Sequence, residues 1–143
     1  MKQSVIAGKI QKIRAFYETG DTKEIPFRKR QLRKLKAAIR KNEQLIMDAL
    51  YKDLKKPAFE SYASEIGILY PEITHAIRHV GSWSKRRRVA TPLIHFYSRS
   101  SVYYEPYGVA LIISPWNYPF QLIIAPLVAA IAAGNCAVMK PSE

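Results

Sequence analysis

Polar side chains occur at two places in the last third of the sequence, where almost every other residue is apolar. Asn117 belongs to the segment Ser-Pro-Trp-Asn-Tyr-Pro at 114–119, and Lys140, Ser142 and Glu143 follow a later apolar segment. An amide such as Asn117 carries two N–H donors of the kind that stabilise an oxyanion. A carboxylate after the second strand of a dinucleotide site binds the adenosine ribose hydroxyls. The pattern points to a nucleotide site beside an oxyanion-binding group.

Both groups also have an ordinary explanation. Lys140 and Glu143 suit a solvated loop, and an asparagine between two prolines suits a turn. The segment around Asn117 also lacks the G-x-G-x-x-G pattern that holds a pyrophosphate. Spacing alone therefore leaves a nucleotide site and a plain loop both open.

A strand, a helix and a second strand are predicted to position these residues. Residues 108–113 are typical of a strand, and residues 120–133 of an apolar helix that tolerates one internal proline and ends at a Gly-Asn pair. Residues 136–140 form the second strand. Such a unit has parallel strands, with ligands bound at their carboxyl ends. Because no charged side chain precedes Lys140 in this unit, we expect both faces of the strands to be buried.

The first part of the chain predicts helices. Apolar residues recur at three- and four-residue spacing over 4–19, 27–55 and 60–84. Ser4 is the expected cap of the first helix. The second segment is one long helix or two helices broken near Asn42.

The end of this helical part predicts a bend and then a ribbon. We expect the helix over 60–84 to bend before Pro71. Residues 85–88 (Lys-Arg-Arg-Arg) predict a basic turn or linker, and 99–105 predict a strand that forms half of a ribbon.

The net charge is +12, and all of it lies in residues 1–105. A nucleic-acid-binding module is therefore the rival interpretation. We disfavour it because no nucleic-acid motif accompanies the basic residues and no aromatic residues are interleaved with them. The basic face of the helix predicted at 27–55 consists of Arg28, Lys29, Arg30, Arg33, Lys34, Lys36, Arg40 and Lys41.

Four short motifs, in order along the chain, together resemble the aldehyde dehydrogenase superfamily. The Trp-Asn-Tyr-Pro-Phe form and the Tyr-Tyr-Glu-Pro-Tyr-Gly lead-in resemble its class 3, fatty-aldehyde-type branch. The similarity is densest over 102–143 and extends more loosely over the helices before it. The motifs are Glu105-Pro106-Tyr107-Gly108-Val109, Pro115-Trp116-Asn117-Tyr118-Pro119, Ala132-Ala133-Gly134-Asn135 and Lys140-Pro141-Ser142-Glu143.

The resemblance implies oxidation of aldehydes to carboxylic acids with NAD or NADP, through a thiohemiacetal on a catalytic cysteine. Asn117 matches the residue that donates its amide to the oxyanion, and Tyr118 matches an aromatic residue of the aldehyde channel. A Glu at 143 suits NAD, whereas the neighbouring Lys140 suits the 2′-phosphate of NADP. The positions implied to bind the cofactor are Ile113, Ser114, Pro115, Trp116, Lys140, Ser142 and Glu143.

The resemblance also implies a fold of class α/β. A helical region of the cofactor domain (1–98) and a β-ribbon segment of the oligomerisation region (99–107) would precede the first βαβ unit of a Rossmann-like NAD(P)-binding sheet (108–143). This is an incomplete aldehyde dehydrogenase fold, because the catalytic cysteine and general-base glutamate of the family have no counterpart here. A homodimer is expected for the full-length protein.

Two parallel strands leave an open edge, so we expect the chain to be the front part of a larger protein, inactive and poorly stable alone. An inactive product of a truncated gene is the remaining alternative. No segment predicts a signal peptide or a membrane span, and we expect a cytoplasmic protein.

Two other candidate sites are disfavoured. Cys136 is the single cysteine and has no nearby His or Lys to lower its pKa, so we expect a structural thiol. His75 and His79, with Glu72, have a spacing that suits zinc, but no further ligand accompanies them and no metal is expected.

Overall fold

The computed structural model describes the backbone of residues 2–142 and the side chains of residues 6–142. Short 3-10 turns and one π-helical turn, Tyr62–Ile66, link the regular elements. The helices are α1 (Lys2–Glu18), α2 (Ile25–Lys41), α3 (Glu43–Leu54), α4 (Ala58–Ser61), α5 (Leu69–Trp83) and α6 (Gln121–Ala133), and the strands are β1 (Arg87–Val89), β2 (Ser100–Val102), β3 (Val109–Ile113) and β4 (Cys136–Lys140).

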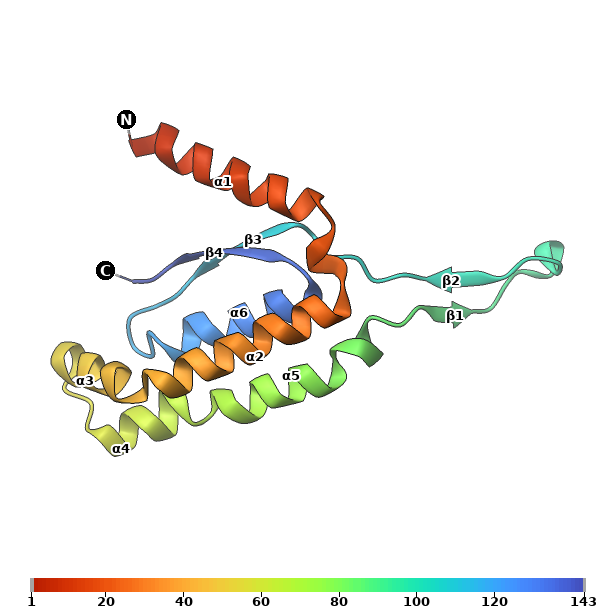
Figure 1. Cartoon of the computed structure of the whole chain (residues 1–143). Coiled ribbons are helices and arrows are strands. Elements are labelled where there is room, and N and C mark those ends of the chain that lie inside the picture. Colours follow the sequence, from red (N-terminus) through yellow and green to blue (C-terminus); the bar gives the residue numbers. More distant parts are fainter. Residues whose placement is uncertain (1, 143) are drawn as a thin grey trace.

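The elements form layers around α6 (Figure 1). Helix α6 lies between the β3–β4 sheet on one side and α2 and α5 on the other, while α1 lies on the far side of the sheet. The β1–β2 ribbon extends away from this body as an arm. The α/β fold class predicted from the sequence is confirmed.

The predicted βαβ unit is present. Strands β3 and β4 pair in parallel, with Val109 opposite Cys136 and Ile113 opposite Lys140. Helix α6 connects them, contains Pro126 and ends at Gly134, whose φ of 88° is the left-handed conformation that glycine adopts most easily.

The expectation that both faces of the strands are buried is wrong for β3. Ile112 faces α6 and is 7% exposed, but Leu111 and Ile113 are each 65% exposed. Helix α1 covers only the amino ends of the strands, where Tyr17 packs against Gly108 and its hydroxyl donates to the Pro106 carbonyl at 2.9 Å. Toward the carboxyl ends α1 diverges from the sheet (Figure 1).

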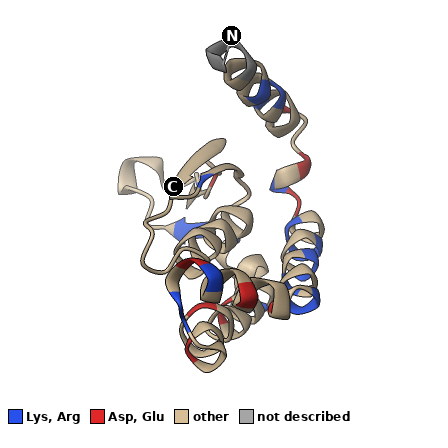
Figure 2. Cartoon of the chain, turned by 90° about the vertical axis from the view of Figure 1, so that its left-hand side faces the viewer, with Lys and Arg blue, Asp and Glu red and all other residues tan. Residues whose placement is uncertain are grey.

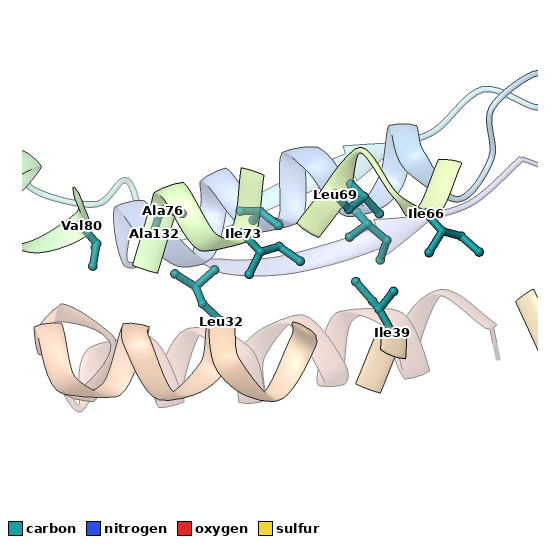
Figure 3. Packing of buried hydrophobic residues seen from close by; sticks show 10 residues of the cluster. Leu32, Ile39, Ile66, Leu69, Ile73, Ala76, Val80 and Ala132 are labelled. Carbon is teal, nitrogen blue, oxygen red and sulfur yellow. The ribbon is translucent and has the colours of Figure 1, made fainter. Parts of the chain in front are cut away.

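The hydrophobic core lies between α2, α5 and α6. Leu32 and Ile39 of α2 point toward Leu69 and Ile73 of α5, and Ala132 of α6 closes the cluster (Figure 3). Leu32 and Ile39 are seven residues apart, and Leu69 and Ile73 are four apart, which places each pair on one face of its helix.

The helical segments differ from the predictions in detail. The first helix begins at Lys2, so Ser4 lies inside it rather than capping it. Residues 27–55 form two helices, α2 and α3, broken at Asn42. The helix predicted over 60–84 is interrupted before Pro71, as expected, by the π-helical turn Tyr62–Ile66 and the two turn residues that follow it, and α5 begins at Leu69. Pro71 lies in the first turn of α5, where its missing N–H costs no helical hydrogen bond.

The basic run at 85–88 is not simply a turn, because Arg87 and Arg88 belong to β1. They pair antiparallel with Val102 and Ser101, which confirms the ribbon predicted for the second strand. All three residues of β1 are exposed, so its sequence has no apolar alternation to reveal a strand.

Arg28 was expected on the solvated face of α2, but it is only 6% exposed. Its guanidinium donates to the carbonyls of Thr22 (2.9 Å), Lys23 (2.8 Å) and Ala132 (3.2 Å) and to the Ser84 hydroxyl (3.0 Å). Burial lowers the pKa of Arg28 against an opposing effect of Glu24, yet arginine remains charged.

Arg28 can reach the end of α6 because Gly134 has no side chain. A Cβ added at Gly134 would lie 2.8 Å from atoms of the guanidinium, which is too close for a real contact. Glycine at this position therefore both ends the helix and leaves room for the buried cation.

We expect the isolated chain to self-associate and to lack a cooperative thermal transition. Leu111 and Ile113 are exposed, and within the described residues each strand of the parallel sheet pairs on one side only. Light scattering and circular dichroism on heating measure both properties. A monodisperse monomer that unfolds cooperatively would contradict this expectation.

A matched pair of variants identifies the surface responsible. Leu111→Lys is expected to reduce self-association far more than Leu45→Lys, although the two leucines are 65% and 66% exposed, because Leu45 lies on a helix without open strand edges.

Candidate functional site

The carboxyl ends of β3 and β4 lie side by side. Ile113 is the register partner of Lys140, and the next N–H, that of Ser114, donates to the Lys140 carbonyl at 3.1 Å. The segment 114–119 that leaves β3, here called the Asn117 loop, therefore starts next to the end of β4. This is the edge at which parallel sheets bind ligands.

Ser114 closes the Asn117 loop from inside. It is 3% exposed, and its Oγ lies 3.1 Å from the Pro115 carbonyl oxygen and 3.3 Å from that of Pro119. Since a hydroxyl has one proton, it donates to these two acceptors alternately or in a shared bond. The two ends of the loop are thus held together.

Asn117 is exposed at the outer part of the loop, and its side-chain amide has no hydrogen-bond partner among the residues that the structure describes. Its backbone carbonyl accepts a hydrogen bond from Lys56 Nζ at 2.8 Å. The same ammonium group lies 4.0 Å from the centroid of the Tyr118 ring, within cation–π range. The backbone of Asn117 is held while its amide is left available.

Glu65 is fully buried in the π-helical turn and lies behind the same loop. Its Oε2 accepts hydrogen bonds from the N–H groups of Phe120 (2.9 Å) and Gln121 (3.4 Å), where α6 begins. Its Oε1 accepts from Lys56 Nζ, which forms an ion pair with it.

Sequence reasoning missed both members of this pair. The signal for Glu65 was its position four residues before Leu69 and eight before Ile73, on the stripe that faces the core. A carboxylate on an apolar stripe requires a partner inside the protein. Lys56, beside Pro57, carried no such signal.

The remaining predicted site residues surround the strand ends. Ile113, Pro115, Trp116 and Lys140 are exposed, with Trp116 at 66%. Ser142 is half-buried, and Glu143 lies outside the described residues.

This set of residues suits a nucleotide in its chemistry. An exposed ammonium group at Lys140 matches anionic or hydroxyl-bearing groups, and the Trp116 ring offers an apolar contact surface.

The other candidates are consistent with a structural role. Burial raises the pKa of the half-buried Cys136 thiol, so it remains protonated at neutral pH. The rings of His75 and His79 stack with centroids 4.1 Å apart, and among the described residues no group of His, Cys, Asp and Glu is arranged to hold a metal.

Charged residues are distributed over the helical part. Basic and acidic segments are interspersed on the helices nearest the viewer in Figure 2, whereas the strands there are mostly uncharged. Within the described part of the chain, no helix is both long and apolar enough to cross a lipid bilayer.

The sequence model of the Aldehyde dehydrogenase family matches residues 6–143. The chain belongs to this family. It is 49% identical over 140 residues to 4,4'-diaponeurosporen-aldehyde dehydrogenase of Staphylococcus aureus, an alignment that covers 98% of this chain and 30% of the relative. It is 44% identical over 134 residues to human aldehyde dehydrogenase family 3 member B1, covering 94% and 29%. The chain therefore spans about 30% of the length of these aldehyde dehydrogenases.

Solved structures of other proteins share the fold of this chain. A substrate-bound Staphylococcus aureus AldH matches with a TM-score of 0.93 at 50% identity, over 96% of this chain and 30% of that one. The glyceraldehyde-3-phosphate dehydrogenase GapN of Methanocaldococcus jannaschii, solved with NADP, matches with a TM-score of 0.71 at 23% identity, over 93% and 28%. The resemblance of the four motifs to aldehyde dehydrogenases, and to the class 3 branch of that family, is confirmed.

Alkylation tests the assignment of Cys136. Because its pKa is raised, a smaller thiolate fraction is present at neutral pH, and we expect iodoacetamide to react more slowly than with free cysteine. The rate should increase only at a pH above that needed for an ordinary thiol. Since the sequence has one cysteine, mass spectrometry reads this site alone. Reaction as fast as that of free cysteine would contradict the assignment.

Proposed function

We propose that this chain is the N-terminal part of an NAD(P)-dependent aldehyde dehydrogenase that oxidises aldehydes to carboxylic acids. The observation that carries the proposal is the exposed Asn117 loop at the shared carboxyl edge of β3 and β4, in a chain whose sequence matches the family over 6–143. The nucleophilic cysteine and the general base belong to the part of the enzyme that this chain does not contain.

Asn117 is the oxyanion donor in this proposal. When a thiolate attacks an aldehyde, negative charge develops on the carbonyl oxygen, and an amide N–H directed at that oxygen stabilises it. The free side-chain amide of Asn117 supports this role, because it has no competing partner among the described residues. Tyr118, on the same loop, would contact the aldehyde.

The cofactor would be held by the strand ends. Lys140 at the end of β4, with Ser142 and Glu143 after it, would bind the adenosine ribose. Residues 113–116, which begin at the last residue of β3, would line the cleft. When bound, the nicotinamide supplies a hydride acceptor. The protein contributes polar groups for the ribose and an apolar surface that limits access of water.

The assembly and location of the enzyme are part of the proposal. Residues 1–98 and 108–143 would belong to the cofactor domain, and the ribbon at 99–107 to an oligomerisation region of a homodimer. Because β1 pairs with β2, the arm that carries this ribbon begins before residue 99. Its exposed tip supports a role in assembly, since Leu93 is 90% and Phe96 is 82% exposed. A cytoplasmic enzyme is proposed, with an aldehyde rather than a nucleic acid as its partner.

Replacement of Asn117 tests the oxyanion role. In the full-length enzyme, Asn117→Ala should lower kcat by about 10²–10³-fold, as for loss of one oxyanion donor. Asn42→Ala is the matched control, because that asparagine bonds to Ala38 at the junction of α2 and α3, away from the strand ends. Steady-state kinetics with a short aldehyde measures both. An unchanged kcat in Asn117→Ala would contradict the role.

Replacement of Glu143 tests the ribose assignment. Glu143→Gln should weaken binding of NAD more than that of NADP, since a carboxylate accepts from the free 2′-hydroxyl but repels a 2′-phosphate. Fluorescence titration gives both Kd values, and Lys140→Met should shift the preference in the opposite direction. Equal changes in the two Kd values for Glu143→Gln would remove the assignment.

A further inference from the structure

The buried pair of Lys56 and Glu65 lies directly behind the Asn117 loop. We infer that these two residues are positioning residues for the reaction, which act by fixing the backbone from which the Asn117 amide projects. This inference rests on the proposed function, because it assigns the pair a task in oxyanion binding.

The pair holds the loop at Asn117 and just after its last residue. Lys56 Nζ donates to the Asn117 carbonyl at 2.8 Å, and Glu65 Oε2 accepts from the Phe120 N–H at 2.9 Å. The ion pair between Lys56 and Glu65 joins these two anchors into one rigid unit. The peptide that follows Asn117 is thereby held in one orientation.

Contacts within the loop, such as that of Ser114 Oγ with the Pro119 carbonyl oxygen, provide only part of this restraint. The N-terminus of α6 has no side-chain cap of its own, and Pro119 has no N–H to donate. Without Glu65, the first N–H groups of α6 would lie unpaired at a partly buried position. The remaining restraint comes from residues more than fifty positions earlier in the chain.

Stability alone does not account for a charged pair at this position. The side chains of Lys56 and Glu65 are 11% and 0% exposed, and moving two charges out of water costs about as much as their attraction returns. In this inference, the pair fixes the geometry of the loop more than it adds stability. A displacement of about 1 Å at a reacting group costs roughly 10²-fold in rate, so the geometry at Asn117 is the quantity that the pair protects.

A double-mutant cycle in the full-length enzyme separates positioning from general support of the fold. Lys56→Met removes the hydrogen bond to the Asn117 carbonyl. This substitution is introduced both into the natural sequence and into the Asn117→Ala variant. Because Lys56→Met leaves a buried carboxylate unpaired, Lys56→Met with Glu65→Gln is the second variant; it removes both charges and keeps an acceptor for the Phe120 N–H.

Tyr70→Phe is the matched control. It removes the bond from the Tyr70 hydroxyl to Glu43, another part-buried contact of the helical layer, but one that does not touch the loop. Its melting temperature shows what loss of a comparable hydrogen bond does to the fold alone.

We expect each Lys56 variant to lower kcat by about 10-fold or more with asparagine at 117, with little change in the Kd of NAD. With alanine at 117, the same variants should change kcat by less than about twofold, because residues that act through one group are not additive. Tyr70→Phe should change kcat by less than about twofold in both backgrounds.

Two results would overturn the inference, and they differ in what else they affect. In the first, the Lys56 variants lower kcat equally with asparagine and with alanine at 117, or lower it in neither background, while Asn117→Ala alone remains impaired. This result would show that the pair only supports the fold, and it would leave the proposed function intact. Full activity of Asn117→Ala itself would remove both the proposed oxyanion role and the inference.

Discussion

Helix α6 has no charge and no polar cap of its own, yet it lies at the centre of the structure between the sheet and the helical layer. Charged side chains from other elements complete the hydrogen bonding at both of its ends. The Glu65 carboxylate accepts from the N–H groups at its beginning, and the Arg28 guanidinium donates to the Ala132 carbonyl at its end. Each charge has the sign that the helix dipole favours at that end.

This arrangement links the strand ends to distant parts of the chain. Arg28 also binds the Thr22 and Lys23 carbonyls and the Ser84 hydroxyl, so one cation joins the start of α2, the end of α5 and the end of α6. The opposite end of α6 is attached through Glu65 and Lys56 to the loop that carries Asn117. The βαβ unit and the helical region therefore depend on each other, although the sequence divides them clearly by charge.

Local patterns predicted the βαβ unit and the Asn117 loop, because a strand–helix–strand order and two prolines around an asparagine are visible within forty residues. The burial of Arg28 was missed because the carbonyl and hydroxyl groups that bind it come from other elements. Glu65 was missed although its place on an apolar stripe was visible, because its partners Lys56 and Phe120 lie elsewhere in the sequence. β1 was missed because pairing across an exposed arm leaves no hydrophobic alternation. Burial of both strand faces was wrongly expected because composition does not reveal which neighbours are present.

The π-helical turn Tyr62–Ile66 keeps the buried face of α4 aligned with the buried face of α5. Ser61, Glu65, Leu69 and Ile73 are all fully buried, although successive steps of four residues drift by about 40° each around an ideal α-helix. The wider turn absorbs part of that drift. Loss of a single residue from the π-helical turn would rotate α4 by about 100° relative to α5 and carry the Glu65 carboxylate out of the interior. The turn therefore tolerates exchange of its side chains far better than a change in its length.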